Sequence, residues 1–362
     1  MTTIYDVAKE AKVSIKTVSR VMNEEHKVKP NTKKIVLEAM KVLDYSPSFA
    51  ARTMVTQKTG LIGLITSAIT SASKIPELAG LPSIDLVKGI QSVIEASGKT
   101  LMIADTGGVI KHAEKLSQTF REHRVEGMIY VSDFSQSIIA PSSFSYIPSV
   151  LVNCLDSTKK IPAVVPDDEI GGFKMAEAVI RKGHRHIGFL SLPTERLGGG
   201  DRQNGFRRAH NKFGIPLNEE LIIPCSQEGA NFDTENKLMT EALSKILSLE
   251  NKPTAICCGN DRMAMNLYKL LNQLGISIPE DISVIGFDNY AMISELLEPG
   301  LTTVELPYAK IGKNGGQKLL KFIRGEKVNP GSMVENISGN VVWRNSVKNN
   351  LILNNTINFK KK

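Results

Sequence analysis

The sequence predicts an α/β protein in which a small all-α head precedes a two-lobed, doubly wound α/β core. Helical apolar spacing alone fills residues 3–43, whereas from Gly60 onward short apolar runs of buried-strand type alternate with amphipathic helical patterns. Charge divides the chain in the same way. Residues 1–60 hold eleven Lys and Arg against six Asp and Glu, while residues 61–359 hold 31 of each. Positive charge concentrated on a short head is typical of phosphate contact.

Residues 3–23 have the pattern of a helix-turn-helix. Thr3 and Asp6 have the spacing of a capping box at a helix start, and Ser14 can cap a second helix after a tight turn. The inward face of that second helix is apolar, with Val18, Val21 and Met22. Its outward face, with long cationic side chains near the helix start, is what a reader of the DNA major groove requires. A solvated amphipathic helix pair is the alternative. The outward residues are Ile15, Lys16, Thr17, Ser19 and Arg20.

A third helix and a short linker follow. Pro30 opens a helix whose apolar side chains are expected to pack on the first two helices: Ile35, Val36, Ala39, Met40 and Leu43. Ser46 and Pro47 then have the pattern of another helix start. They predict a hinge helix of only about eight residues within 47–59. Isolated helices shorter than about 12–15 residues are marginal in water, so this segment is expected to fold only against a partner. A flexible tether is the alternative.

From Gly60 onward the sequence predicts two series of alternating strands and helices. Strands of this kind, separated by 10–15-residue helical patterns, indicate parallel sheets whose ligands lie beyond the carboxyl ends of the strands. The expected strands are 61–65, 101–104, 128–131, 149–152, 186–190, 254–258 and 282–287. The expected helices are 84–96, 111–122, 171–181, 202–213, 234–247 and 262–274.

Several classes of protein lack support in the sequence. No apolar run approaches a membrane span and no signal peptide is apparent, so we expect a cytoplasmic protein with no membrane partner. The four cysteines have no framework spacing, and Cys257 and Cys258 lie in a strand-like run, which favours buried thiols. The six histidines are scattered, so we expect no metal and no cofactor. Phosphate-loop, nucleophile-elbow and zinc-protease patterns are missing, which argues against an enzyme.

Residues 3–23 resemble the DNA-binding head of the lactose-repressor/galactose-repressor family of bacterial transcription regulators. The resemblance continues through Val28-Lys29-Pro30 and Leu43-Asp-Tyr-Ser-Pro47, and then across the core to about Ser346. It implies a periplasmic-binding-protein-like core of two lobes. The chain would return to the first lobe after about Ala291, and roughly the last 40 residues would complete the second lobe. On this basis the chain divides into a helix-turn-helix domain (1–46), a hinge helix and linker (47–59), an effector-binding and dimerisation core (60–346) and a polar basic tail (347–362).

The resemblance also implies function. A homodimer would bind near-palindromic double-stranded operator DNA, as a repressor whose affinity a small-molecule effector alters. Paired hinge helices would bend the DNA by wedging Met54, where the family usually has Leu, between central base pairs. The tail lacks leucine heptads, so a tetramer through a terminal coiled coil is not expected. The expected DNA contacts are Thr3, Tyr5, Ser14, Ile15, Lys16, Thr17, Ser19, Arg20, Asn23, Ser48, Arg52 and Met54.

The expected effector contacts are Arg202, Asp288, Asn260, Phe232 and Asp167. Arg202, Asp288 and Phe232 match positions of the family's site, and Asn260 and Asp167 follow expected strands. Turn or cap roles for Asp288 and Asn260, and a core position for Phe232, are the alternatives. Residues 66–82 form a loop about nine residues longer than the family's and without an aromatic residue. The identity of the effector therefore stays open among a neutral sugar, a sugar acid, a sugar phosphate and a purine, as does its role as inducer or co-repressor. A stand-alone small-molecule-binding protein with the same core is the alternative function.

Overall fold

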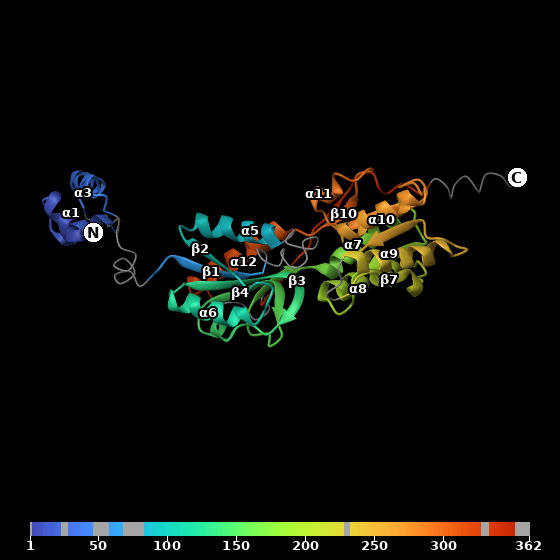
Figure 1. The fold of residues 1–362 in the computed structure, drawn as a ribbon, viewed down its shortest axis with the longest axis horizontal. Helices are drawn as coiled ribbons and strands as arrows, with labels where there is room; N and C mark the ends of the chain where they lie inside the picture. The colour runs from blue at the N-terminus through green and yellow to red at the C-terminus, as the bar shows by residue number, and fades with distance from the viewer. Residues whose placement is uncertain are drawn as a thin grey trace. The chain divides into compact units, whose positions relative to one another are not determined.

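The computed structural model describes residues 2–22, 28–45, 58–67, 83–227, 232–326 and 333–351 (Figure 1). The chain forms two compact units, Met1–Gly60 and Leu61–Lys362. The first unit is the all-α head and the second is the α/β core. The segment expected to form the hinge helix lies outside the described residues over 46–57, as does most of the long loop that begins at residue 66.

The head contains the expected helix-turn-helix. Helices α1 (Ile4–Glu10) and α2 (Ile15–Met22) are joined by a tight turn, and α3 (Pro30–Val42) follows. The Asp6 carboxylate accepts hydrogen bonds from the Thr3 amide at 2.8 Å and the Thr3 hydroxyl at 2.7 Å. The Ser14 hydroxyl accepts from the Thr17 amide at 3.1 Å, which caps α2. Both predicted helix starts are therefore confirmed.

A small apolar cluster holds the three helices together. Its buried members are Val7, Ala8, Ala11, Val18, Val21, Val36 and Ala39. Met22, Met40 and Leu43 pack against it, as expected. The expectation for Ile35 is wrong, because its side chain is 46% exposed. Val36 and Ala39 alone supply the buried residues of α3, so Ile35, one position before Val36, is turned away from the cluster.

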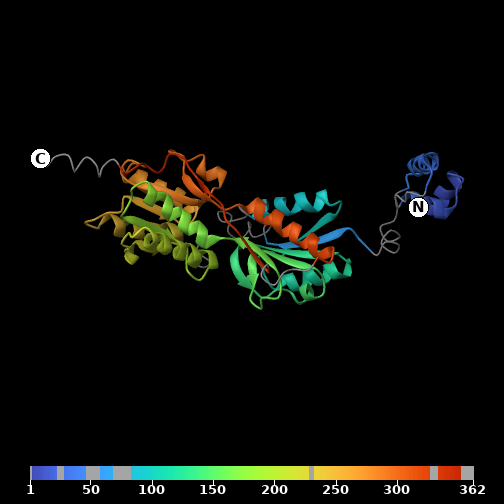
Figure 2. The same ribbon diagram turned by 180° about the vertical axis from the view of Figure 1, so that it is seen from behind.

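The first sheet has the strand order β11-β5-β4-β3-β1-β2, and all its pairings are parallel. Helices α5 and α12 lie side by side on one face, and α6 covers the other (Figures 1 and 2). The strands are β1 (Leu61–Thr66), β2 (Thr100–Asp105), β3 (Gly127–Ile138), β4 (Ser149–Asp156), β5 (Ala163–Pro166) and β11 (Val334–Ile337). The helices are α5 (Ser83–Ala96), α6 (His112–Glu122) and α12 (Tyr308–Ile323).

The second sheet has the order β12-β10-β9-β8-β6-β7, parallel except for the β10–β12 pair. Cys257 packs in the cluster with α7 and α8, whereas its neighbour Cys258 packs with α9 and α10, so each helix pair covers one face. The strands are β6 (Ile187–Ser191), β7 (Ile222–Pro224), β8 (Ala255–Cys258), β9 (Ser283–Asp288), β10 (Thr302–Glu305) and β12 (Val341–Val342). The helices are α7 (Asp168–Arg181), α8 (Leu197–Lys212), α9 (Phe232–Leu247), α10 (Asp261–Gln273) and α11 (Ala291–Ser294).

The point at which the chain returns to the first lobe differs from the prediction. Helix α11 and strand β10 still belong to the second lobe, and β10 pairs in parallel with β9. The return begins at Tyr308 with α12, and β11 pairs with β5 of the first sheet. The last residues do not simply finish the second lobe, since only β12 and the segment after it rejoin that sheet.

Three further observations complete the fold. All four cysteines are buried and free, as predicted from the strand-like run at Cys257 and Cys258 and the lack of framework spacing. The chain stays packed against the second lobe as far as Asn350, whose amide donates to the Lys182 carbonyl at 2.7 Å. Among the helices that the structure describes, none combines the length and apolar character that crossing a membrane requires.

Candidate functional site

Helix α2 presents its outward residues to solvent. Ile15 is 40% exposed and Lys16 is exposed, on the side opposite the buried Val18 and Val21. Thr17, Ser19 and Arg20 are half-buried on the same helix. An apolar side chain beside a cationic one at a helix start can contact a thymine methyl and a guanine edge in the major groove.

The other expected DNA contacts divide into two groups. Thr3, Tyr5 and Ser14 are exposed, and the Ser14 and Thr17 hydroxyls lie 2.9 Å apart. Capping uses the side chains of Thr3 and Ser14, so these two residues also fix the starts of the helices that carry the remaining contacts. Asn23, Ser48, Arg52 and Met54 lie outside the described residues.

A second site is built around Arg202, which is only 6% exposed. Its Nε donates to Asp168 Oδ1 at 2.8 Å, and its Nη1 donates to the Gly259 carbonyl at 2.5 Å. The guanidinium carbon lies 3.7 Å from the centroid of the Phe287 ring, a close cation–π contact. Burial opposes the charge of Arg202, but the nearby carboxylates of Asp168 and Asp288 raise its pKa above the ordinary value. The Arg202 guanidinium is therefore fixed in place and stays charged.

Close packing of α7 against α8 brings Arg202 to Asp168. A Cβ atom at Gly172 would lie 2.1 Å from the Arg202 carbonyl oxygen, and one at Gly205 would lie 2.0 Å from the Glu169 carbonyl oxygen. A Cβ at Gly198 would meet Asp168 Oδ2 at 2.9 Å. Only glycine allows these backbones to approach so closely. Gly172, Gly198 and Gly205 therefore belong to a contact between α7 and α8 that positions the site, whereas Gly199 packs on the Pro193 carbonyl of the segment after β6.

Asp288 ends strand β9 at the same edge of the sheet. Its φ of 119° is a conformation that residues with a side chain rarely adopt, and such conformations cluster at functional sites. The Tyr308 hydroxyl donates to Asp288 Oδ1 at 3.2 Å. Burial raises the pKa of Asp288 to about 6, although the charge of Arg202 acts in the opposite direction. The Asp288 carboxylate is thus a strong acceptor held in a poorly solvated place.

Asp261, the first residue of α10, is a second buried carboxyl group beside Asp288. Its oxygens accept from the Thr303 hydroxyl at 2.6 Å and from the Tyr290 amide at 2.8 Å. Burial, followed by the negative charge of Asp288, raises the pKa of Asp261 to about 8. Asp261 therefore holds its proton more tightly than an ordinary carboxyl group. The charged Arg202 guanidinium and the Asp288 carboxyl group place a donor and an acceptor at one edge of the sheet, which suits a polyol or another multiply hydrogen-bonding ligand.

The structure brings Arg202 and Asp288 together, as the sequence predicted. Asn260 lies between Gly259 and Asp261, but its Oδ1 caps α10 by accepting from the Met263 amide at 2.7 Å. Asp167 likewise caps α7, accepting from the Ile170 amide at 3.1 Å. Both oxygens thus have a structural task. Phe232 begins α9, and its side chain lies outside the described residues.

Sequence reasoning missed three members of this site: Asp168, Asp261 and Tyr308. The signal for the first two was an acidic residue directly after an expected contact, at the first position of a helix: Asp168 after Asp167 and Asp261 after Asn260. Tyr308 begins α12 and had no local signal. Among the described residues, no group of three or more His, Cys, Asp or Glu side chains could hold a metal ion.

A helix-turn-helix head joined to a two-lobed α/β core, with a buried polar site at the strand ends, defines a DNA-binding regulator with a ligand-binding core. Two family models match the chain. The model of bacterial regulatory proteins of the lacI family matches residues 3–48, and the model of the periplasmic binding protein-like domain matches residues 176–347. The chain is 33% identical over 350 residues to the HTH-type transcriptional repressor PurR of Vibrio parahaemolyticus serotype O3:K6, covering 96% of this chain and 99% of that protein.

A second relative is catabolite control protein A of Priestia megaterium, 31% identical over 348 residues, with 96% of this chain and 99% of that protein covered. A solved LacI-family regulator from Rhizobium etli is 33% identical, with a TM-score of 0.71 over 80% of this chain and all of that one. The lac repressor dimer bound to operator shares the fold, with 22% identity, a TM-score of 0.75, and coverage of 96% and 99%. This chain belongs to the lacI family of bacterial regulatory proteins and is a transcription regulator, not an enzyme.

Proposed function

We propose that this protein is a repressor that binds a near-palindromic operator as a homodimer, and that a small polyhydroxylated or sugar-like effector at Arg202 and Asp288 alters its affinity for DNA. The observation that carries this proposal is the combination, on one chain, of an exposed face of α2 with buried, hydrogen-bonded Arg202 and Asp288 side chains in the core. A head alone would bind DNA without regulation, and a core alone would bind ligand without a target.

The head supports the DNA part of the proposal. Two heads related by a two-fold axis would place α2 of each subunit in successive major-groove half-sites, about 34–36 Å apart. Ile15, Lys16 and Arg20 are our candidates for base contacts, and Thr3, Tyr5 and Ser14 for backbone contacts. The proposed role in binding DNA has the support of two similar proteins, since PurR is named a transcriptional repressor and the lac repressor dimer has been solved bound to operator.

The core supports the effector part. Arg202 and Asp288 lie at the carboxyl edge of the second sheet, where doubly wound sheets bind their ligands. Solved structures of the same fold include a CelR–cellobiose complex and a LacI-family regulator from Enterococcus faecium with bound ribose. We infer a sugar-like effector for this chain as well, and we place it in the cytoplasm, where the operator is.

The experiment that tests the DNA part is selection from a random pool of duplexes by the full chain. The proposal expects an enriched sequence with two inverted half-sites, bound with one dimer per duplex by sedimentation. A matched variant, Lys16→Ala with Arg20→Ala, should still dimerise yet enrich no such sequence. Enrichment of a single, non-repeated site or an identical selection by the variant would contradict the proposed mode of binding.

A further inference from the structure

Over the described residues, the chain passes between the two lobes at three places. The first crossing is Asp167, between β5 of the first sheet and α7 of the second lobe. The second crossing is residues 306–307, between β10 and α12. The third crossing is residues 338–340, between β11 of the first sheet and β12 of the second. A rotation of one lobe against the other must bend these short segments.

The third crossing is held against the second lobe through its last two residues. A Cβ atom at Gly339 would lie 1.9 Å from the Glu305 carbonyl oxygen, so the backbones of the crossing and of β10 are in direct contact. The Glu305 amide also donates to the Asn340 carbonyl at 2.8 Å. On the side of the first lobe, Ile337 still pairs with β5. Bending of the third crossing is therefore confined to Ser338, which is exposed.

Lys174 on α7 adds a side-chain anchor to the same two residues. Its Nζ donates to the Gly339 carbonyl at 2.5 Å and to Asn340 Oδ1 at 3.3 Å. The Lys174 side chain is half-buried, and no ion pair engages it within the part of the chain that the structure describes. Hydrogen bonds from a charged donor are stronger than those between neutral groups. The charge of Lys174 is thus used to hold the third crossing to α7.

The crossings are joined to each other and to the effector site by backbone hydrogen bonds. The Leu306 amide, in the second crossing, donates to the Asp288 carbonyl at 3.1 Å. The Asp167 amide, in the first crossing, donates to the Ile337 carbonyl at 3.0 Å, directly before the third. A displacement at Asp288 can therefore reach the second crossing, and then the third through Glu305. Contiguous networks of this kind can carry coupling between sites.

We propose that Lys174 is a positioning residue for the regulation of DNA binding. By fixing Gly339 and Asn340 to α7, it limits the lobes to few relative arrangements, among them the arrangement in which the heads bind operator. This inference rests on the proposed function and deepens it, because it names a residue outside the effector site on which operator affinity depends.

The expected effect follows from the population of the binding arrangement. The apparent dissociation constant equals the intrinsic one divided by the fraction of protein in the competent arrangement. A looser third crossing permits more arrangements and lowers that fraction. Operator binding should then weaken, although neither the heads nor Arg202 and Asp288 are altered.

The test uses the full chain without ligand and the substitution Lys174→Met, which removes the ammonium group and keeps an aliphatic side chain. Hydrogen exchange of the Glu305 amide should become about tenfold faster, because its acceptor belongs to the loosened crossing. The Val284 amide, which donates to the Ser346 carbonyl at 2.9 Å in the same lobe, should keep its rate.

The second readout is DNA affinity. Lys174→Met should bind the operator selected by the wild type at least about threefold more weakly. Its affinity for random duplexes should stay unchanged, because the heads are intact. Lys174→Arg should behave as the wild type in both readouts, since it keeps the charge and offers donors for both acceptors.

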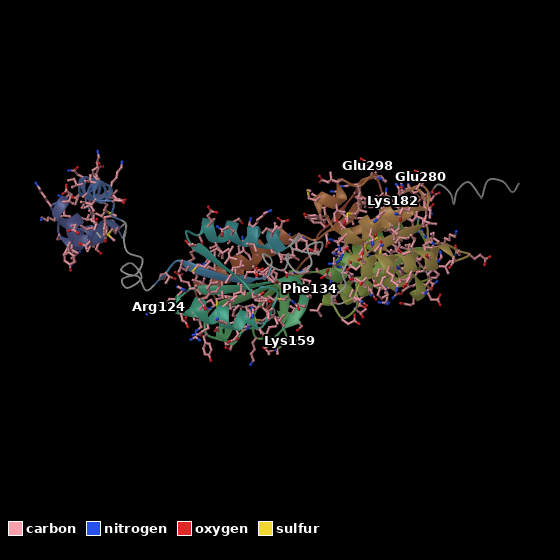
Figure 3. The ribbon with its side chains drawn as sticks, viewed as in Figure 1. Arg124, Phe134, Lys159, Lys182, Glu280 and Glu298 are labelled. Atoms are coloured by element: carbon pink, nitrogen blue, oxygen red, sulfur yellow. The ribbon has the colours of Figure 1, made fainter. Side chains whose placement is uncertain are left out.

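Lys182→Met is the matched control. Lys182, labelled in Figure 3, is the C-cap residue of the same helix, and its Nζ lies 5.0 Å from the centroid of the Trp343 ring, beyond the third crossing. The control removes the same charge and should change neither exchange at Glu305 nor operator affinity. Gly339→Ala displaces the crossing independently, because its Cβ would overlap the Glu305 carbonyl. Its effect on operator affinity should not multiply with that of Lys174→Met, since both act on one segment.

Each outcome decides the inference. Unchanged exchange at Glu305 in Lys174→Met would show that Lys174 does not hold the crossing. Faster exchange with an unchanged operator affinity would reduce Lys174 to a structural residue and overturn the proposal, as would an equal loss of operator affinity in Lys182→Met. A wild type that selects no operator contradicts the proposed function itself, whereas a Lys174→Met variant that binds operator like the wild type contradicts only this inference.

Discussion

Replacing Arg202 with methionine should destabilise the core strongly, because it leaves the Asp168 carboxylate without its partner. Asp168 is 3% exposed and Arg202 is 6% exposed, so water cannot replace the lost 2.8 Å hydrogen bond. Removing one partner of such a buried pair costs about 3–5 kcal/mol. At about 2–4 °C per kcal/mol for a large domain, the core transition should fall by roughly 6–20 °C.

A second substitution separates the cost of the unpaired charge from the cost of lost packing. Arg202→Met combined with Asp168→Asn has no unpaired charge, so the free energy of unfolding should recover by about half or more of the loss. The assay is denaturant unfolding followed at neutral pH, with Arg207→Met as the control, because its exposed pair should contribute at most about 1 kcal/mol. A double variant no more stable than Arg202→Met would refute the reasoning, as would a shift of the single variant no larger than the control's.

The remaining predictions concern DNA reading, pH and the hinge. Arg20→Ala should cost about 1–3 kcal/mol on the preferred operator and much less on random DNA; equal losses would mean that Arg20 contacts only phosphate. Burial raises the pKa of Asp261 from 3.8 to about 8 in the folded chain, so the free energy of unfolding should fall as the pH rises from about 4 to 8. Asp261→Asn should lack this fall, and pH profiles of the free energy of unfolding that run parallel in the two proteins would contradict the prediction. Met54→Gly should abolish DNA bending in a circular-permutation assay without changing the sedimentation of the free dimer, and bending equal to wild type would exclude a hinge wedge.

Element types were predictable from the sequence, whereas some boundaries were not. The helix expected at 84–96 is observed at Ser83–Ala96, because its apolar periodicity is strong and uninterrupted. Helix α8 begins at Leu197 instead of the expected Arg202. Three successive glycines disfavour a helix locally, but here Gly198 permits the close approach of Asp168 and Gly199 permits that of the Pro193 carbonyl, so tertiary packing overrides propensity. Helix α7 begins at Asp168, three residues before the expected start at Gly171.

The site was predictable only in part, for a related reason. Arg202 and Asp288 follow strands that the sequence identifies, and parallel strands bring their carboxyl ends to one edge. Their partners come from elsewhere: Asp168 follows a strand of the first sheet, and Tyr308 begins the helix by which the chain returns to the first lobe. A periodic pattern cannot show such pairings. The expected return near Ala291 was wrong because the weak patterns of α11 and β10 do not reveal to which sheet they belong. The roles of Asn260, Phe232 and Asp167 in binding an effector stay predictions.

The central claim is that ligand at the Arg202–Asp288 site changes the affinity of the head for DNA. A ligand can be found first by thermal shift, since 100 times its dissociation constant should stabilise the core by about 2.7 kcal/mol. The decisive measurement is then the dissociation constant for the selected operator, with and without that ligand, for the wild type and for Asp288→Asn. The wild type should change its affinity by about 5–150-fold, whereas Asp288→Asn should bind free operator within about threefold of wild type and lose the response to ligand. An unchanged operator affinity of the wild type at saturating ligand, or a full response by Asp288→Asn, would contradict the account.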